Sequence, residues 1–146
     1  MKTYLGVFAG NDGPDSIDWA MMLLNMYEAW FQSTGDFVKR TGCGRGGYIE
    51  VSCDPEFILE SEIGVHRLVR LSPHDSAHRR CTTFCGVTMT VGETPAKLRD
   101  KDGDAMWASL RRSYVLYPYK LVRDHQTGNE SQEVERFLAG ELDLLE

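Results

Sequence analysis

Hydrophobic and polar residues alternate along several short stretches of the chain, and this period of two predicts β-strands. The stretches, each rich in β-branched and aromatic residues, are residues 2–9, 48–53, 63–71, 80–90 and 109–116. Turn-forming residues separate them, including the glycine-rich segment 42–47 and the loop 72–78. Because the strands follow one another as hairpins, we expect a largely antiparallel sheet.

From Ile17 the spacing of apolar residues changes to the 3.6-residue period of a helix. One predicted face carries Ile17, Met21, Leu24, Tyr27 and Phe31. Other large apolar residues occupy much of the remaining circumference: Trp19, Met22, Leu23, Met26 and Trp30. A helix that is apolar nearly all round is expected to be buried between layers. Residues 12–16 supply the helix start, residues 33–35 its end, and a second short helix is predicted over 133–138. The predicted fold class is α+β, an antiparallel sheet with packed helices.

Length and composition are those of one folded domain spanning residues 1–146. With 42% hydrophobic and 26% charged residues, the chain can bury a core, and intrinsic disorder is excluded. Its longest apolar stretch, residues 20–24, is far shorter than the roughly 20 residues that a bilayer requires. The N-terminal residues have no long apolar core, so no secretory signal is expected. We therefore expect a cytoplasmic protein without a membrane partner.

Charge is distributed unevenly along the chain. The net charge of −6 disfavours a nucleic-acid partner, but residues 129–146 alone contribute six acidic residues and one Arg. Residues 66–80, in contrast, contain four Arg, three His and a single Asp. Salt limits the reach of each charge to about 10 Å, so a basic segment can contact phosphates although the whole protein is acidic.

The sequence offers little catalytic chemistry. It has no nucleophile elbow, no His-Glu-x-x-His zinc motif, no P-loop and no dinucleotide-binding fingerprint. The four cysteines, 43, 53, 81 and 85, lack the spacing of a zinc site and are expected to be reduced structural residues. His66, inside a predicted strand, is expected to be packed or hydrogen-bonded, and acids 102 and 104 to lie in a solvated loop. No catalytic residue, metal or cofactor is expected.

The segment 66–83 is the exception. Short polar side chains stand at a turn fixed by Pro and Ser, with arginines on both sides. This is the arrangement that contacts base edges beside a phosphate backbone. A merely solvated loop is the alternative.

Several collinear motifs point to a known family. Residues 61–70, Ser-Glu-Ile-Gly-Val-His-Arg-Leu-Val-Arg, resemble a T-E-x-G-V-H-R-L-V-R run, and residues 72–76, Ser-Pro-His-Asp-Ser, resemble S-P-F-D-S. Residues 79–84 stand at R-R-H-T-S-F, residues 9–20 at A-G-x-G-G-T-E-A-x-D-W-A, residues 112–119 at R-S-Y-V-x-x-P-Y and residues 138–143 at L-D-G-x-L-D. These patterns belong to bacterial class I peptide chain release factors of the UGA/UAA-reading type, which the chain resembles over nearly its whole length.

The resemblance implies the codon-recognition superdomain of these factors, with the ribosome as partner through its decoding centre, its rRNA and the stop codon of the mRNA. By this carry-over, Gly13 and Asp15 would meet the first uridine. The discriminator tripeptide would be Ser72, Pro73 and His74, and the second and third bases would lie beside Cys81 and Thr82. The dense basic stretch, Arg67, Arg70, Arg79 and Arg80, is expected to contact rRNA phosphates.

The family's catalytic part has no counterpart in this sequence. The Gly-Gly-Gln tripeptide that hydrolyses peptidyl-tRNA is absent, and only a short linker, residues 91–107, stands where its domain should lie. The family's N-terminal helical domain also has no counterpart. Hydrolysis needs a group positioned at the ester, so we expect a protein that is not an enzyme.

Three departures affect the expected codon contacts. His74 replaces a Phe, Ala77-His78 replace two glycines, and Cys81 replaces a His ring whose stacking on a base is worth ~1–3 kcal/mol. The leading hypothesis is a non-hydrolytic protein that occupies the ribosomal A site and modulates termination, with weak stop-codon discrimination. The alternatives are an adaptor that recruits a protein partner, which could supply hydrolysis in trans, and a repurposed RNA- or protein-binding domain without a ribosomal role.

Overall fold

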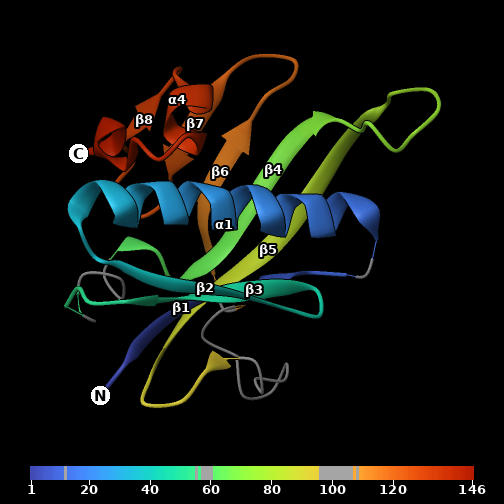
Figure 1. Ribbon diagram of the computed structural model, residues 1–146. Helices are drawn as coiled ribbons and strands as arrows, with labels where there is room; N and C mark the ends of the chain where they lie inside the picture. Colours follow the sequence, from blue (N-terminus) through green and yellow to red (C-terminus); the bar gives the residue numbers. More distant parts are fainter. Residues whose placement is uncertain (12, 55, 57–60, 96–106, 108) are drawn as a thin grey trace.

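The computed structural model of the protein is a twisted β-sheet with helices on one face (Figure 1). The structure describes residues 1–11, 13–54, 56, 61–95, 107 and 109–146. The strands within them are β1 (Thr3–Ala9), β2 (Phe37–Cys43), β3 (Gly46–Val51), β4 (Gly64–Leu71), β5 (Arg80–Val91), β6 (Leu110–Val115), β7 (Leu121–Asp124) and β8 (Glu130–Ser131). Their order is β2-β3-β1-β5-β4-β6-β7-β8, and every neighbouring pair is antiparallel except β4 and β6.

The long helix α1 (Pro14–Thr34) crosses one face of the sheet (Figure 1). Pro14 suits the first turn because its missing N–H needs no partner there, and Gly35 ends the helix in the left-handed region at φ 83°. Its buried side, which includes Trp19, Leu23 and Met26, packs on the apolar faces of β1, β3 and β5. This layer contains most of the core.

The C-terminal segment completes the same layer. Helix α4 (Val134–Leu138) packs Phe137 against Tyr114 of β6, with ring centroids 5.8 Å apart, and the 3-10 helix η2 (Leu142–Leu145) adds Leu142 and Leu145 to the core. Tyr114 in turn contacts Trp19 of α1 at 4.8 Å. Both C-terminal helical segments therefore join the core on the side of the sheet that α1 covers.

The predicted fold class is confirmed: the fold is α+β, with a mainly antiparallel sheet and packed helices. Sequence patterns did not indicate β2, β7 or β8. β2 is an edge strand in which Lys39 is exposed, so it shows no regular apolar alternation, and β8 has only two residues. The parallel pairing of β4 with β6 was also not predicted, because it joins strands separated by a long connection.

One expectation about α1 is wrong. Its apolar residues nearly all round predict a helix buried between layers, but Ile17 and Met21 are 37% and 45% exposed. The helix is not enclosed between two layers. It covers a single sheet face, so the turn that points Trp19 and Leu23 inward leaves Ile17 and Met21 toward solvent.

Other expectations concern the linker and the cysteines. Most of the predicted linker 91–107, with acids 102 and 104, lies outside the described residues. All four cysteines are unbridged, and Cys85 is fully buried. In the part of the chain that the structure describes, no helix combines the length and apolarity needed to cross a bilayer.

Candidate RNA-recognition site

The loop that joins β4 to β5, residues 72–79, is held against the first turns of α1. We call it the tip loop; it projects beyond the sheet at the end of the β4–β5 hairpin (Figure 1). Ser72 Oγ donates a hydrogen bond to Asp15 Oδ2 at 2.7 Å. Arg70 Nη2 donates to Asp15 Oδ1 at 3.0 Å and to Asp18 Oδ2 at 3.4 Å. His74 Nε2 donates to Asp18 Oδ2 at 2.5 Å. The start of α1 therefore fixes both ends of the Ser72–His74 tripeptide.

The tip loop is also ordered by its own hydrogen bonds. Ser72 Oγ accepts from the backbone N–H of His74 at 3.1 Å, and the Ser72 N–H donates to the Arg79 carbonyl at 3.0 Å. Asp75 accepts from the Ala77 N–H at 3.0 Å and from Arg79 Nε at 2.8 Å. The bond from Arg79 lowers the pKa of Asp75 to about 2. The loop is therefore preorganised, with Pro73 and His74 exposed at its surface.

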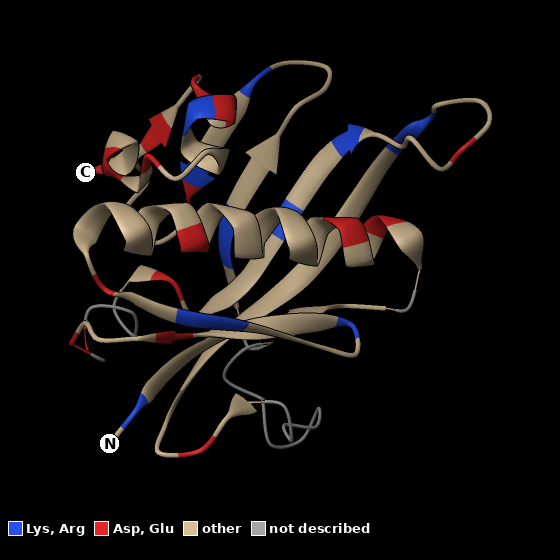
Figure 2. Ribbon diagram, viewed as in Figure 1, with Lys and Arg blue, Asp and Glu red and all other residues tan. Residues whose placement is uncertain are grey.

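Opposite charges meet where the tip loop contacts α1. Figure 2 shows acidic residues at the start of α1 and basic residues at the end of β4 and the start of β5. The hydrogen bond from His74 lowers the pKa of Asp18. Burial raises the pKa of the Cys81 thiol, and Asp15 raises it further through its charge and a hydrogen bond. Cys81 is therefore a neutral thiol at the edge of the same cluster.

The structure brings together six of the seven residues expected to read a codon. Gly13 is the N-cap of α1, and Asp15, Ser72, Pro73, His74 and Cys81 surround its first turns. Thr82 lies apart from them. It follows Cys81 on β5, and because consecutive strand residues point to opposite faces, its side chain is on the other face of the sheet.

The four predicted phosphate-contacting arginines have different surroundings. Arg70 is engaged by Asp15 and Asp18, and its side chain is only 14% exposed. Arg79 pairs with Asp75 but remains 78% exposed, and Arg80 is exposed at the start of β5. Arg67 lies on the sheet face opposite α1, because it alternates with His66, which points toward the helix. Two of the four therefore have accessible side chains at the tip loop: Arg79 is its last residue and Arg80 follows it.

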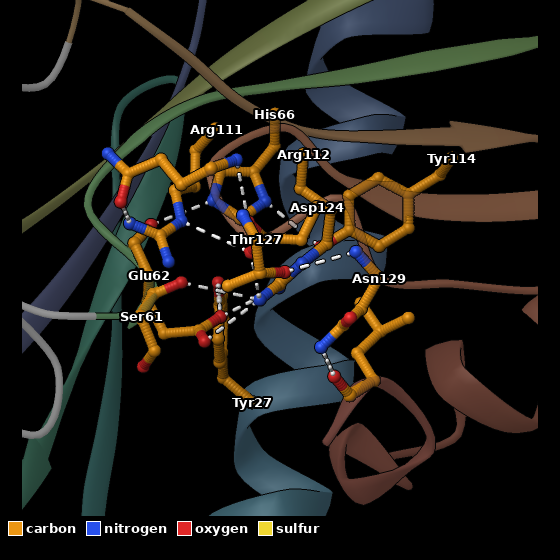
Figure 3. Close-up of polar contacts among 12 residues, drawn as sticks. Tyr27, Ser61, Glu62, His66, Arg111, Arg112, Tyr114, Asp124, Thr127 and Asn129 are labelled. Atoms are coloured by element: carbon orange, nitrogen blue, oxygen red, sulfur yellow. Dashed lines mark hydrogen bonds and ion pairs between the residues drawn. The ribbon is translucent and has the colours of Figure 1, made fainter.

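A buried polar network joins the start of β4 to α1, β6 and β7, at the end of β4 away from the tip loop (Figure 3). Arg112 forms a bidentate ion pair with Glu62, at 2.8 and 3.0 Å, and both side chains are less than 5% exposed. Tyr27 of α1 donates to the same carboxylate at 2.8 Å. Although burial alone would raise it, the charge of Arg112 keeps the pKa of Glu62 below its ordinary value. Sequence reasoning missed this network. Glu62 and Arg112 stand in two of the family motifs, but the motifs do not indicate which side chains pair across 50 positions of the chain.

His66 completes the network and is packed and hydrogen-bonded, as expected. It is fully buried, and burial together with the charge of Arg112 lowers its pKa to about 3. The neutral ring donates from Nε2 to the Glu62 carbonyl at 2.8 Å and accepts at Nδ1 from the Tyr114 hydroxyl at 2.9 Å. A group with these partners fixes the loop before β4 to β6 and has no access to a substrate. Among the described residues, no set of three or more His, Cys, Asp or Glu side chains could hold a metal ion.

Comparisons with known proteins agree with this architecture. The peptide chain release factor 2 of Thermomicrobium roseum is 27% identical over 226 residues, covering 95% of this chain and 60% of the relative. That of Roseobacter denitrificans is 26% identical, covering 97% of this chain and 61% of the relative. The matched regions are longer than the 146 residues of the chain, so part of each relative within them has no counterpart here. The chain thus spans less than two thirds of the length of these relatives.

The fold and a family model identify the relationship. The structure superimposes on release factor 2 of Thermus thermophilus with a TM-score of 0.73, at 24% identity, covering 99% of this chain and 66% of that one. The model of the PCRF domain matches residues 1–87, which include α1, the tip loop and the first part of β5. These matches confirm the resemblance to bacterial release factors, and the chain belongs to the PCRF-domain family.

Proposed function

We propose that this protein binds the ribosomal A site through its tip loop and modulates translation termination without hydrolysing peptidyl-tRNA itself. The preorganised tip loop carries the proposal. Groups held in place before binding recognise an mRNA base at a lower entropic cost. Asp15 and Asp18, which both accept from Arg70, hold the Ser72–His74 tripeptide with its Pro73 and His74 exposed. The family relationship supports the ribosome as the partner, in the cytoplasm.

The lack of hydrolysis is proposed from what the sequence omits. No Gly-Gly-Gln tripeptide occurs anywhere in the 146 residues. The relatives contain a segment within the matched region that this chain does not. A protein that occupies the A site without a group positioned at the ester would compete with a complete release factor.

We further propose that stop-codon discrimination is weak. Where the relatives' pattern has an apolar Phe, His74 is bound to Asp18, so its Nε2–H is already used within the protein. Cys81 supplies a small thiol in place of a ring and therefore cannot stack on a base. Binding should then depend on the ribosome more than on the codon.

Co-sedimentation with ribosomes tests this function. Binding should occur to ribosomes carrying a stop codon in the A site and, within a few-fold, to those carrying a sense codon. The double substitution Cys81→His with His74→Phe should increase the preference for the stop codon, each contact being worth ~1–3 kcal/mol. No co-sedimentation of the folded protein with either kind of ribosome would refute the proposal.

A further inference from the structure

The sheet face opposite α1 carries a row of side chains that crosses four neighbouring strands. The strand register pairs Phe84 of β5 with Arg67 of β4, Arg67 with Ser113 of β6, and Ser113 with Arg123 of β7. We call these four residues the cross-strand row. Neighbouring strands lie about 4.8 Å apart, so the row spans about 14 Å. The helices α1, α4 and η2 all join the core on the other face.

The cross-strand row combines an exposed aromatic ring with basic side chains. Phe84 is 42% exposed, which is unusual for a phenylalanine in the middle of a sheet, and Arg123 is also exposed. Neither Arg67 nor Arg123 forms an ion pair within the described residues, and the Nε of Arg67 is without a hydrogen-bond partner there. The face therefore presents an exposed ring, Phe84, and an exposed cation, Arg123, with the half-buried Arg67 between them.

A histidine at the end of β7 lies beside the cross-strand row. His125 Nε2 shares a hydrogen bond with Ser113 Oγ at 2.7 Å, which places the imidazole beside the row. Burial lowers the pKa of His125, and the charges of Arg67 and Arg123 lower it further, as expected where cations gather. Two acids are close to the row: Asp124 pairs with Arg111, and Glu130 on β8 stands directly opposite Arg123, on the same face at the end of the row.

We infer that the cross-strand row binds an unpaired segment of ribosomal RNA, with a base stacked on Phe84 and phosphates contacted by Arg67 and Arg123. An exposed aromatic ring on an open sheet, flanked by arginines, suits single-stranded RNA because any base can stack while the cations contact the backbone. This inference rests on the proposed function, since it assigns the protein a second contact with the ribosome.

The geometry favours ribosomal RNA over the messenger as the occupant. Of the residues expected to meet the codon, Asp15, Ser72 and Cys81 gather on the α1 side of the sheet, and Thr82 alone points to the opposite face. The cross-strand row is on the opposite face. A codon triplet held at the α1 side cannot also cover this row, so the RNA that contacts Phe84 must be a different strand.

Affinity measurements on the full chain test the inference. Phe84→Ala should weaken binding of a fluorescent ten-nucleotide oligouridine by about five-fold or more, since stacking is lost. The double substitution Arg67→Ala with Arg123→Ala should also weaken oligouridine binding. It should reduce the slope of log affinity against log salt concentration by about one unit for each phosphate contact that is lost. Val38→Ala and Lys39→Ala serve as matched controls, because both residues are exposed on β2 at the other end of the strand order. Thermal unfolding verifies that each variant is folded.

The same variants are then compared on vacant and on stop-programmed ribosomes. Phe84→Ala should lower the affinity for both by the same factor. If Phe84→Ala lowered the affinity for stop-programmed ribosomes alone, the messenger would lie on this face. If it lowered the affinity for ribosomes but not for oligouridine, a ribosomal protein would lie there. Either result overturns the inference, as does an unchanged affinity in all the assays. If the wild-type protein bound no ribosomes, the proposed function would fail instead, which separates the two outcomes.

Discussion

Glu62 and Arg112 show how much one buried residue can matter to this fold. Both side chains are almost completely buried, and each is the main partner of the other. Glu62→Gln should therefore destabilise the protein by about 3–5 kcal/mol, because it leaves the Arg112 charge uncompensated in the core. Urea unfolding measures this loss. Glu135→Gln, which removes the partner of the half-exposed Lys120, is the matched control and should cost less than about 1 kcal/mol. Equal losses would show that the buried pair has no special role.

His66 gives the protein a specific dependence on pH. Its pKa is about 3 in the folded state but about 6.5 when unfolded, so the unfolded chain takes up the proton first as the pH falls. The contribution of His66 to stability is complete above pH 6.5 and declines below it, by roughly 1.4 kcal/mol per pH unit.

Comparing the wild type with His66→Gln by urea unfolding between pH 7 and 5 isolates this contribution. The variant should show a flatter pH dependence, whereas His78→Asn, in the exposed loop at φ 48°, should keep the wild-type slope. In the wild-type protein, the His66 ring should show no NMR titration over this range. A ring that titrates near pH 6.5 would contradict its buried, neutral state.

For single residues, the sequence predicted whether a side chain is buried or exposed better than it predicted which side chain it contacts. The packing of His66 could be expected from its place in an apolar strand. Its hydrogen bond to Tyr114 joins residues 48 positions apart, and the ion pair of Glu62 with Arg112 joins residues 50 apart. Pairings at such separations are set by the topology of the sheet, which no local pattern encodes.

The pairing of β3 with β1 requires a glycine at one position of β3. An added Cβ at Gly46 would lie 1.9 Å from the carbonyl oxygen of Val7 on β1, whereas at Gly42 it would meet nothing within 4 Å. Gly46→Ala should therefore lower the free energy of unfolding by about 1–3 kcal/mol, and Gly42→Ala should lower it much less. Thermal unfolding of the two variants checks this. A fully stable Gly46→Ala protein would contradict the pairing of β1 with β3.

The start of α1 and the tip loop should behave as one unit. Asp15→Asn removes the charge that holds Arg70 and weakens the bond to Ser72, so amide hydrogen exchange in residues 72–79 should accelerate about ten-fold or more, for a loss of about 1.4 kcal/mol or more. Glu28→Gln, at the other end of α1 and paired with Arg40, should leave this exchange unchanged. Unchanged exchange in Asp15→Asn would show that the loop is ordered without α1.

Elements with regular periodicity were predictable, and those without it were not. The strand β1, the hairpin of β4 and β5, and helix α1 follow alternating or helical patterns closely. The polar edge strand β2 and the two-residue β8 are determined by their neighbours rather than by their own residues. The exposed side of α1 was also misjudged, because large apolar residues occupy it as well as the buried side.

The whole molecule has the family fold but lacks a segment that its relatives contain within the matched region. Recognition of the family required the collinear motifs, and the structure adds that its tip loop is braced by α1 while a basic, aromatic row lies on the opposite face. Acidic residues are concentrated instead at the C-terminal end (Figure 2).

Occupation of the A site is tested most directly by peptide release from stop-programmed ribosomes, catalysed by a complete release factor 2 while this protein is titrated in. The release rate should fall toward the spontaneous rate as the protein occupies the A site, and the protein alone should release no peptide. An unchanged release rate at saturating protein, or release by the purified protein on its own, would contradict the proposed function.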